Sequence, residues 1–187
     1  MLLTTITLNK PGQGLVHDAQ AVHRTLKYLD PNVLWGCPDG LHLIIQHTHS
    51  IDWMTGLGRV MRMAHTTYAH QPDVGDTVDI ALIGNPTLCQ PRPGQRRGKR
   101  VPAPPDKWMG WLHKRLDPCL TIHHVEATKL TPARGQKPTM RTTTQRVLYT
   151  ATATVTDPDM LDQLKTSGVG QGKAYGCGLL ITQEVTK

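Results

Sequence analysis

The sequence predicts an α+β fold made of two tandem units with antiparallel sheets. In the N-terminal half, segments with strand-like and helix-like apolar spacing follow one another as strand, helix, two strands, helix and strand. In the C-terminal half, helix, two strands, helix and strand recur, without a clear first strand. A proline- and glycine-rich stretch, residues 85–105, separates the halves. This order is that of two ferredoxin-like (RRM-like) domains, and we expect them at 1–86 and 105–187 with a basic linker at 87–104.

The first strand and the first helix have the clearest patterns. Leu2–Leu8 alternates as a strand does, and Pro11-Gly12-Gln13-Gly14 breaks it. A helix is predicted from about Leu15 to Leu29, ending before Asp30-Pro31. Its apolar residues recur at intervals of four, three, four and three, which forms one stripe: Leu15, Ala19, Val22, Leu26 and Leu29.

Three more elements complete the first predicted unit. Residues 33–35 and 41–47 flank Pro38-Asp39-Gly40, whose turn chemistry predicts a hairpin. A weaker helix follows. Thr77–Ile83 then alternates as a strand does, and we expect it to close the first unit. The apolar face of that helix comprises Trp53, Leu57, Val60 and Met61.

The second predicted unit begins with a helix at 105–116, with Trp108, Trp111 and Leu112 inward. Strands are predicted at 120–130 and 146–155, separated by a polar, basic loop at 131–145. A short helix capped by Asp157 leads into the glycine-rich loop, and the chain closes with an apolar strand.

Composition favours a polyanionic partner. The 187 residues carry 21 Lys and Arg against 14 Asp and Glu, a formal net charge of +7. Four widely separated cysteines without zinc-site spacing indicate free thiols, and we expect no metal site. The N-terminus lacks a signal peptide and no apolar run approaches a membrane span, so we expect a cytoplasmic protein with no membrane partner.

The segment Gly168 to Leu180 holds five glycines and Lys173 before a strand. Dense glycines let backbone N–H groups approach a phosphate. A dinucleotide-binding GxGxxG or a Walker A loop must precede a helix, whereas this loop follows one and precedes the last strand. We therefore expect a phosphate-binding loop but no nucleotide cofactor, and no cofactor of any other kind.

Three stretches together resemble the CasE family, the CRISPR-associated endoribonuclease that processes CRISPR RNA precursors in type I-E systems. They are residues 22–26 (VHRTL), Gly84-Asn85-Pro86 followed by 98–101 (GKRV) and Trp111-Leu112, and the loop from Gly168 to Leu180. The resemblance implies a duplicated ferredoxin-like fold and recognition of the CRISPR repeat stem-loop. It also implies metal-independent cleavage at the base of that stem, after which the enzyme stays bound to the crRNA with the other Cascade subunits.

His23 matches the catalytic histidine of that family. Helical spacing places it on a polar flank with Gln20 three residues before and Lys27 four residues after. Metal-free cleavage needs a group that exchanges protons with the ribose 2′-OH or the leaving 5′-oxygen, and a histidine titrates near neutral pH. The expected products carry a 2′,3′-cyclic phosphate and a 5′-hydroxyl. Relatives often carry a tyrosine where this chain has Gln20, which cannot shuttle a proton at ordinary pH.

RNA binding is expected from basic side chains and from the glycine loop. The basic segment around Arg134 is predicted to engage the stem, and the 92–100 stretch to add backbone contacts. The full predicted set is Arg24, Arg92, Arg96, Arg97, Lys99, Arg100, Arg134, Lys137, Arg141, Gly170, Gly172 and Lys173.

Two alternatives remain open at this point. The first is a non-catalytic duplicated RRM-like RNA-binding subunit. Aromatic residues on the central strands would favour this function, and the sequence lacks them there. A two-histidine phosphoesterase would need paired His-x-Thr motifs, and only His65-Thr66-Thr67 fits. The histidines at 47, 49, 123 and 124 have no Cys or carboxylate partner at metal-ligand spacing.

Overall fold

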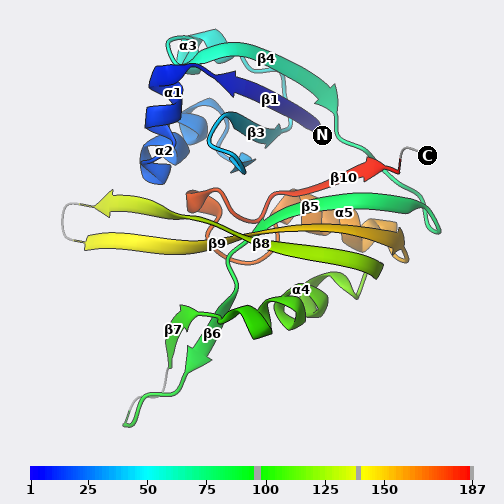
Figure 1. The fold of residues 1–187 in the computed structure, drawn as a ribbon. Coiled ribbons are helices and arrows are strands. Elements are labelled where there is room, and N and C mark those ends of the chain that lie inside the picture. Colours follow the sequence, from blue (N-terminus) through cyan, green and yellow to red (C-terminus); the bar gives the residue numbers. More distant parts are fainter. Residues whose placement is uncertain (95–97, 138–139, 186–187) are drawn as a thin grey trace.

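The protein is described from a computed structural model, and the structure describes residues 1–94, 98–137 and 140–185. The chain forms two four-stranded antiparallel sheets and a separate two-stranded arm (Figure 1). The first unit lies over one face of the second sheet, while the helices of the second unit cover the other face (Figure 1). Within these described ranges, no helix has the length and apolarity that crossing a bilayer requires.

The first unit has the strand order β2-β3-β1-β4. Alternate residues of β1, including Ile6 and Leu8, are buried against Val22 and Leu26 of α2. This packing fixes α2 on the sheet, and other parts of the helix contact β8 and η2. The elements are β1 (Leu2–Leu8), α1 (Lys10–Leu15), α2 (Ala19–Leu29), β2 (Leu34–Gly36), β3 (His42–His47), α3 (Trp53–Leu57) and β4 (Met61–Tyr68).

The helix predicted at about 15–29 begins later, at Ala19, and ends at Leu29 as predicted. The Asp18 side chain accepts hydrogen bonds from the backbone N–H groups of Gln20 and Ala21, at 3.0 and 3.2 Å, and so begins α2 at Ala19. Residues 10–15, predicted as a strand break, form α1, which Asn9 caps. The catalytic candidate His23 therefore lies in the second turn of a capped helix.

The second unit has the equivalent strand order, β10-β5-β9-β8. Its core joins Val78, Ile80 and Leu82 of β5 to Trp111 and Leu112 of α4. The elements are β5 (Thr77–Gly84), the 3₁₀ turn η1 (Pro105–Lys107), α4 (Trp108–Leu116), β8 (Leu120–Lys137), β9 (Met140–Val155), α5 (Pro158–Ser167), the 3₁₀ turn η2 (Lys173–Tyr175) and β10 (Leu180–Glu184).

The assignment of the 77–83 strand to the first unit is wrong. β5 pairs with β9 and β10, so it supplies the first strand that the second unit lacked in the sequence. The closing strand of the first unit is β4, which pairs with β1 where the end of a helix was predicted. β4 lies at the sheet edge and its side chains are mostly exposed, so it has no apolar alternation. We propose a domain boundary between β4 and β5 in place of residue 86.

Two predicted loops are largely hairpins. The basic loop at 131–145 extends β8 and β9 into one long hairpin, whose pairing runs to Lys137 and Met140. Within the predicted linker at 87–104, β6 (Thr87–Gln90) pairs with β7 (Lys99–Pro102) as an arm that projects from the second unit beside α4 (Figure 1). Polar and basic composition concealed both hairpins, because neither has a buried face along its whole length.

Candidate functional site

His23 lies on α2, one helical turn after Gln20, and this helix contacts both β8 and η2. Its side chain is partly buried, and its Nδ1 atom is buried without a hydrogen-bond partner. Burial, and secondarily the positive charge of Lys27, lower the pKa of His23 below its ordinary value. The imidazole is therefore neutral at neutral pH, a state in which it can accept a proton.

Gln20 joins α2 to the C-terminal loop, one turn before His23. Its Nε2 atom donates a hydrogen bond to the Tyr175 hydroxyl, at 3.3 Å. Because the phenol oxygen accepts that bond, its own hydrogen remains available to a substrate. Sequence reasoning missed Tyr175, although the missing tyrosine at position 20 was a signal that a phenol had to come from elsewhere.

Gly135 of β8 closes this arrangement from a third side. A Cβ atom added there would lie 2.7 Å from the Tyr175 ring and 2.8 Å from the Gln20 side chain. The close approach requires a residue without a side chain. Three segments, α2, β8 and η2, therefore converge at Gln20, one helical turn from His23. Gly135 lies 115 residues after Gln20 in the sequence, and Tyr175 lies 40 residues after Gly135.

The glycine loop needs its glycines for its own conformation. All five, at 168, 170, 172, 176 and 178, have positive φ angles. At Gly176 a Cβ atom would also lie 2.8 Å from the Trp35 ring. Structural demands thus account for all five glycines, where one or two were expected from a tight connection alone.

Some amides of the loop remain open to a ligand. Internal backbone hydrogen bonds use the amides of 168, 169 and 175–178. In the described part of the chain, those of Gly170 and Gly172 are outside this hydrogen-bonded set. Lys173 is exposed, with its stem against Gly168 and Gly178. The predicted phosphate contacts at Gly170, Gly172 and Lys173 are therefore accessible.

The remaining predicted RNA-binding residues fall into two groups. Arg24 is exposed on α2, and Arg134 forms a β-bridge with Asp18 beside the start of that helix. Lys137 and Arg141 belong to the strand ends of the same hairpin. Arg92, Lys99 and Arg100 belong to the β6–β7 arm and do not meet at His23 (Figure 1), and Arg96 and Arg97 lie outside the described residues.

Arg115 is a further basic residue at the glycine loop that the sequence analysis missed. Its guanidinium lies 4.0 Å from the centre of the Trp111 ring and donates a hydrogen bond to the Trp111 carbonyl, at 2.9 Å. A Cβ atom at Gly170 would lie 2.8 Å from Trp111 and 3.5 Å from Arg115 Nε. The spacing of Trp111 and Arg115, four residues apart on one helix face, was the available signal.

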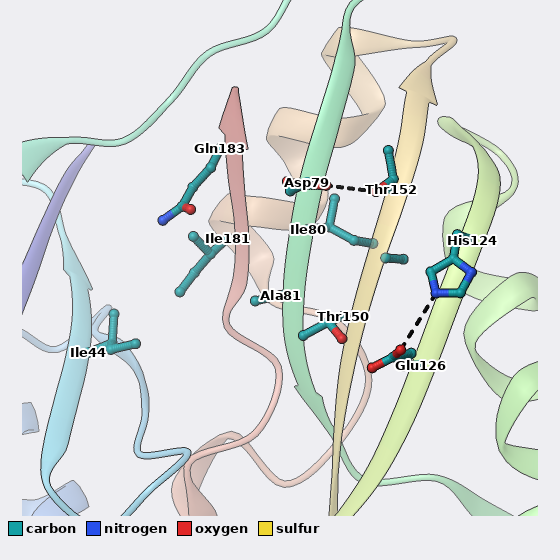
Figure 2. Close-up of a pocket in the computed structure, with 11 residues that line it drawn as sticks. Ile44, Asp79, Ile80, Ala81, His124, Glu126, Thr150, Thr152, Ile181 and Gln183 are labelled. Atoms are coloured by element: carbon teal, nitrogen blue, oxygen red, sulfur yellow. Dashed lines mark hydrogen bonds and ion pairs between the residues drawn. The ribbon is translucent and has the colours of Figure 1, made fainter. Parts of the chain in front are cut away.

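The face of the second sheet that is turned toward the first unit has a different character. A cavity of about 460 Å³ lies over it (Figure 2). The Thr152 hydroxyl donates a hydrogen bond to the Asp79 carboxylate, at 2.7 Å, and His124 Nε2 lies 3.7 Å from Glu126 Oε1. Its lining residues include two carboxylates but no Lys, Arg, Tyr or Trp. This face therefore lacks the aromatic platform and the positive charge with which RRM-like sheets bind RNA.

Two of the histidines that were weighed as metal ligands, His47 and His123, have structural partners. His47 is buried, with Nε2 2.7 Å from the Thr4 hydroxyl and Nδ1 2.7 Å from the His49 carbonyl. His123 Nε2 lies 2.7 Å from the Thr154 hydroxyl. Across the residues that the structure describes, no three His, Cys, Asp or Glu side chains gather as a metal site would require.

Comparisons with known proteins identify relatives over nearly the whole chain. A family model described as CRISPR associated protein matches residues 1–183. No curated protein matches. Among solved structures, the chain is similar to the CRISPR-associated protein Cas6e from Escherichia coli str. K-12, with 22% identity and a TM-score of 0.75 over 99% of this chain and 100% of that one.

Two further structures have the same fold. A structure of the CRISPR endoribonuclease Cse3 bound to 19 nt RNA has 22% identity and a TM-score of 0.83, covering 97% of this chain and 98% of that one. A chain of a CRISPR RNA-guided surveillance complex has 20% identity and a TM-score of 0.71, covering 99% and 100%. These likenesses and the two sheets confirm the predicted tandem ferredoxin-like fold.

Proposed function

The chain belongs to the CRISPR-associated protein family, as its resemblance to CasE predicted, and on this basis we propose that it is a metal-independent endoribonuclease. It recognises the CRISPR repeat stem-loop and cleaves the precursor at the base of the stem. It then stays bound to the mature crRNA as a subunit of the Cascade surveillance complex. Similar folds in an RNA-bound endoribonuclease and a surveillance complex support this proposal.

The observation that carries the proposal is the hydrogen bond between Gln20 and Tyr175, one helical turn from His23 on α2. His23 accepts the proton of the ribose 2′-OH, and the 2′-oxygen forms a bond to the adjacent phosphorus. The bond from phosphorus to the 5′-oxygen breaks, and that oxygen leaves with a proton. The products carry a 2′,3′-cyclic phosphate and a 5′-hydroxyl. General base action of this kind contributes about 10² to 10⁴-fold.

The neighbouring groups have separate roles in this proposal. Because Nδ1 of His23 is buried, Nε2 is the nitrogen that exchanges the proton. Gln20 is a positioning residue that holds the Tyr175 hydroxyl, whose free hydrogen donates to a phosphate oxygen or to the leaving group. The ammonium groups of Lys27 and Lys173 offset the negative charge that develops at phosphorus.

Affinity in this proposal comes from phosphate contacts and selectivity from the shape of the stem. Arg24 contacts the stem near α2, together with three basic residues of the β8–β9 hairpin: Arg134, Lys137 and Arg141. The open amides of Gly170 and Gly172, with Lys173 and Arg115, bind phosphates at the glycine loop. The β6–β7 arm supplies additional backbone contacts through Lys99 and Arg100. These contacts also hold the scissile ribose in position for attack.

The alternative function is a non-catalytic RRM-like RNA-binding subunit. The carboxylate-lined face in Figure 2 argues against RRM-type binding through the second sheet. The test is incubation of a repeat hairpin with excess protein in EDTA. We expect one cut at the base of the stem, and RNA that binds yet stays intact after prolonged incubation would establish the non-catalytic function.

The lowered pKa of His23 predicts the pH dependence of cleavage. A general base is lost as pH falls through its own pKa, so the single-turnover rate decreases on the acidic side, with a midpoint below the ordinary pKa of a histidine. Lys27→Gln removes a charge that lowers this pKa, so the acidic limb moves to higher pH. Single-turnover rates across the acidic range measure the midpoint of the limb.

Lys114→Gln is the matched control, because Lys114 is an exposed lysine on α4, in the other unit. It removes the same charge and leaves the midpoint unchanged. A rate that rises as pH falls through this range would instead make His23 the general acid. An unshifted acidic limb in Lys27→Gln would show that Lys27 does not affect the pKa of His23.

A further inference from the structure

A basic cleft lies beside the site, and its lining includes none of the residues to which the proposed mechanism assigns a role in the chemistry. It has a volume of about 830 Å³ and lies between the first unit and the β8–β9 hairpin. Lys129, Arg134 and Arg146 bring positive charge to it, while Pro38 and Pro132 provide apolar wall. His17 also lines it, and its exposed imidazole can stack on a base.

The charge of this cleft is not neutralised within the protein. Asp39 is the one carboxylate among the described lining residues, and its carboxylate lies 2.6 Å from His42 Nδ1. No ion pair of Lys129, Arg134 or Arg146 with a carboxylate occurs in the part of the chain that the structure describes. Unpaired cations along an open cleft favour a polyanion.

Arg146 is held in place by the two units together. Its Nε donates to the Thr131 carbonyl at 3.1 Å, and its Nη1 donates to the Cys37 carbonyl at 3.3 Å. Because both acceptors are uncharged, the guanidinium keeps its full charge. It is therefore a preorganised cation at the junction of the units.

The cleft and the His23 site are neighbours on one strand. Arg134 lines the cleft and bridges to Asp18, whereas the next residue, Gly135, contacts Gln20 and Tyr175. Successive residues of a strand face opposite sides, so the hairpin separates the two sites. Along α2, His23 lies roughly 7.5 Å beyond Asp18 at 1.5 Å per residue.

We infer that this cleft binds the single-stranded RNA that adjoins the base of the stem, and this inference rests on the proposed function. A strand that passes the His23 site continues around the hairpin into the cleft. Its phosphates contact Lys129 and Arg146, and its bases lie against Pro38, Pro132 and His17.

The test compares three non-cleavable RNAs: the bare repeat hairpin, the hairpin with a single-stranded 5′ extension, and the hairpin with a 3′ extension. We expect one extension to increase affinity. If Lys129 and Arg146 each contact one phosphate of the strand, the salt slope steepens by about 1.4. The advantage of the extended RNA then decreases about sevenfold between 50 and 200 mM salt.

Lys129→Gln with Arg146→Gln removes these two contacts. The double variant loses the advantage of the extended RNA and keeps its affinity for the bare hairpin. Lys129→Gln is also tested alone, because Lys129 is exposed and its side chain makes no hydrogen bond or ion pair within the described residues. This single variant loses about half of the added slope, so the inference can be tested even if the double variant misfolds. The control Lys114→Gln changes neither quantity.

The outcomes separate the inference from the proposed function. Equal affinity for all three RNAs in the wild-type protein would overturn the cleft assignment while leaving hairpin recognition intact. An equal loss of affinity for bare and extended RNA in the variants would also overturn it. Failure of the wild-type protein to bind the bare hairpin would overturn the proposed function itself.

Discussion

His23→Ala abolishes cleavage of the repeat hairpin while leaving its affinity nearly unchanged. The imidazole belongs to α2, which contacts β8 and η2, and its neutral form is the proposed base. Its loss therefore decreases the single-turnover rate by about 10² to 10⁴-fold. Binding depends on the basic residues and the glycine loop, which the substitution leaves in place. Single-turnover rates and equilibrium binding of a non-cleavable hairpin measure the two effects.

His113→Ala is the matched control for this experiment. His113 is a partly exposed histidine on α4 whose Nδ1 lies 2.8 Å from Asp117, distant in sequence from the site. Its substitution keeps both the rate and the affinity. If His23→Ala loses rate and affinity to the same extent, His23 has a folding or binding role instead, and thermal unfolding of the variant distinguishes these two.

A single 2′-deoxyribose at the nucleotide 5′ of the break stops the reaction completely. The 2′-oxygen is the nucleophile in the proposed mechanism, and removing it leaves no group to attack the phosphorus. The hairpin still binds, because the stem and its phosphates are unchanged. Gel analysis of the substituted RNA beside the all-ribose RNA measures the effect.

The matched substrate control carries the deoxyribose one nucleotide further from the break. That RNA is cleaved at a rate close to that of the unmodified hairpin. Continued cutting at the substituted position would exclude attack by the 2′-oxygen and point to attack by water.

The sequence predicted the elements with one buried face and missed those without it. β1, the β2–β3 hairpin, α4 and α5 have clear apolar periodicity, and the structure confirms them. The exposed edge strand β4 has none, so no strand was predicted there, and only its first residue, Met61, was assigned to a helix. That error shifted β5 into the wrong sheet, because local patterns do not specify which strands pair over long distances.

The sequence predicted only the part of the site that lies on one helix. Gln20, His23 and Lys27 share a flank of α2 because helical spacing requires it. Tyr175 reaches Gln20 from the opposite end of the chain, and the contact needs a bare backbone at Gly135. The cleft at Arg146 also depends on the docking of the two units, through the Cys37 carbonyl. Neither juxtaposition has a local signature in the sequence.

The central claim is transesterification by the protein's own side chains, and the ends of the RNA report it most directly. The measurement is mass spectrometry of both fragments after the wild-type protein has cut a repeat hairpin in EDTA. The proposed mechanism predicts a 2′,3′-cyclic phosphate on the upstream fragment and a 5′-hydroxyl on the downstream fragment. A 3′-hydroxyl with a 5′-phosphate, or cleavage that appears only when a divalent metal is restored, would contradict it.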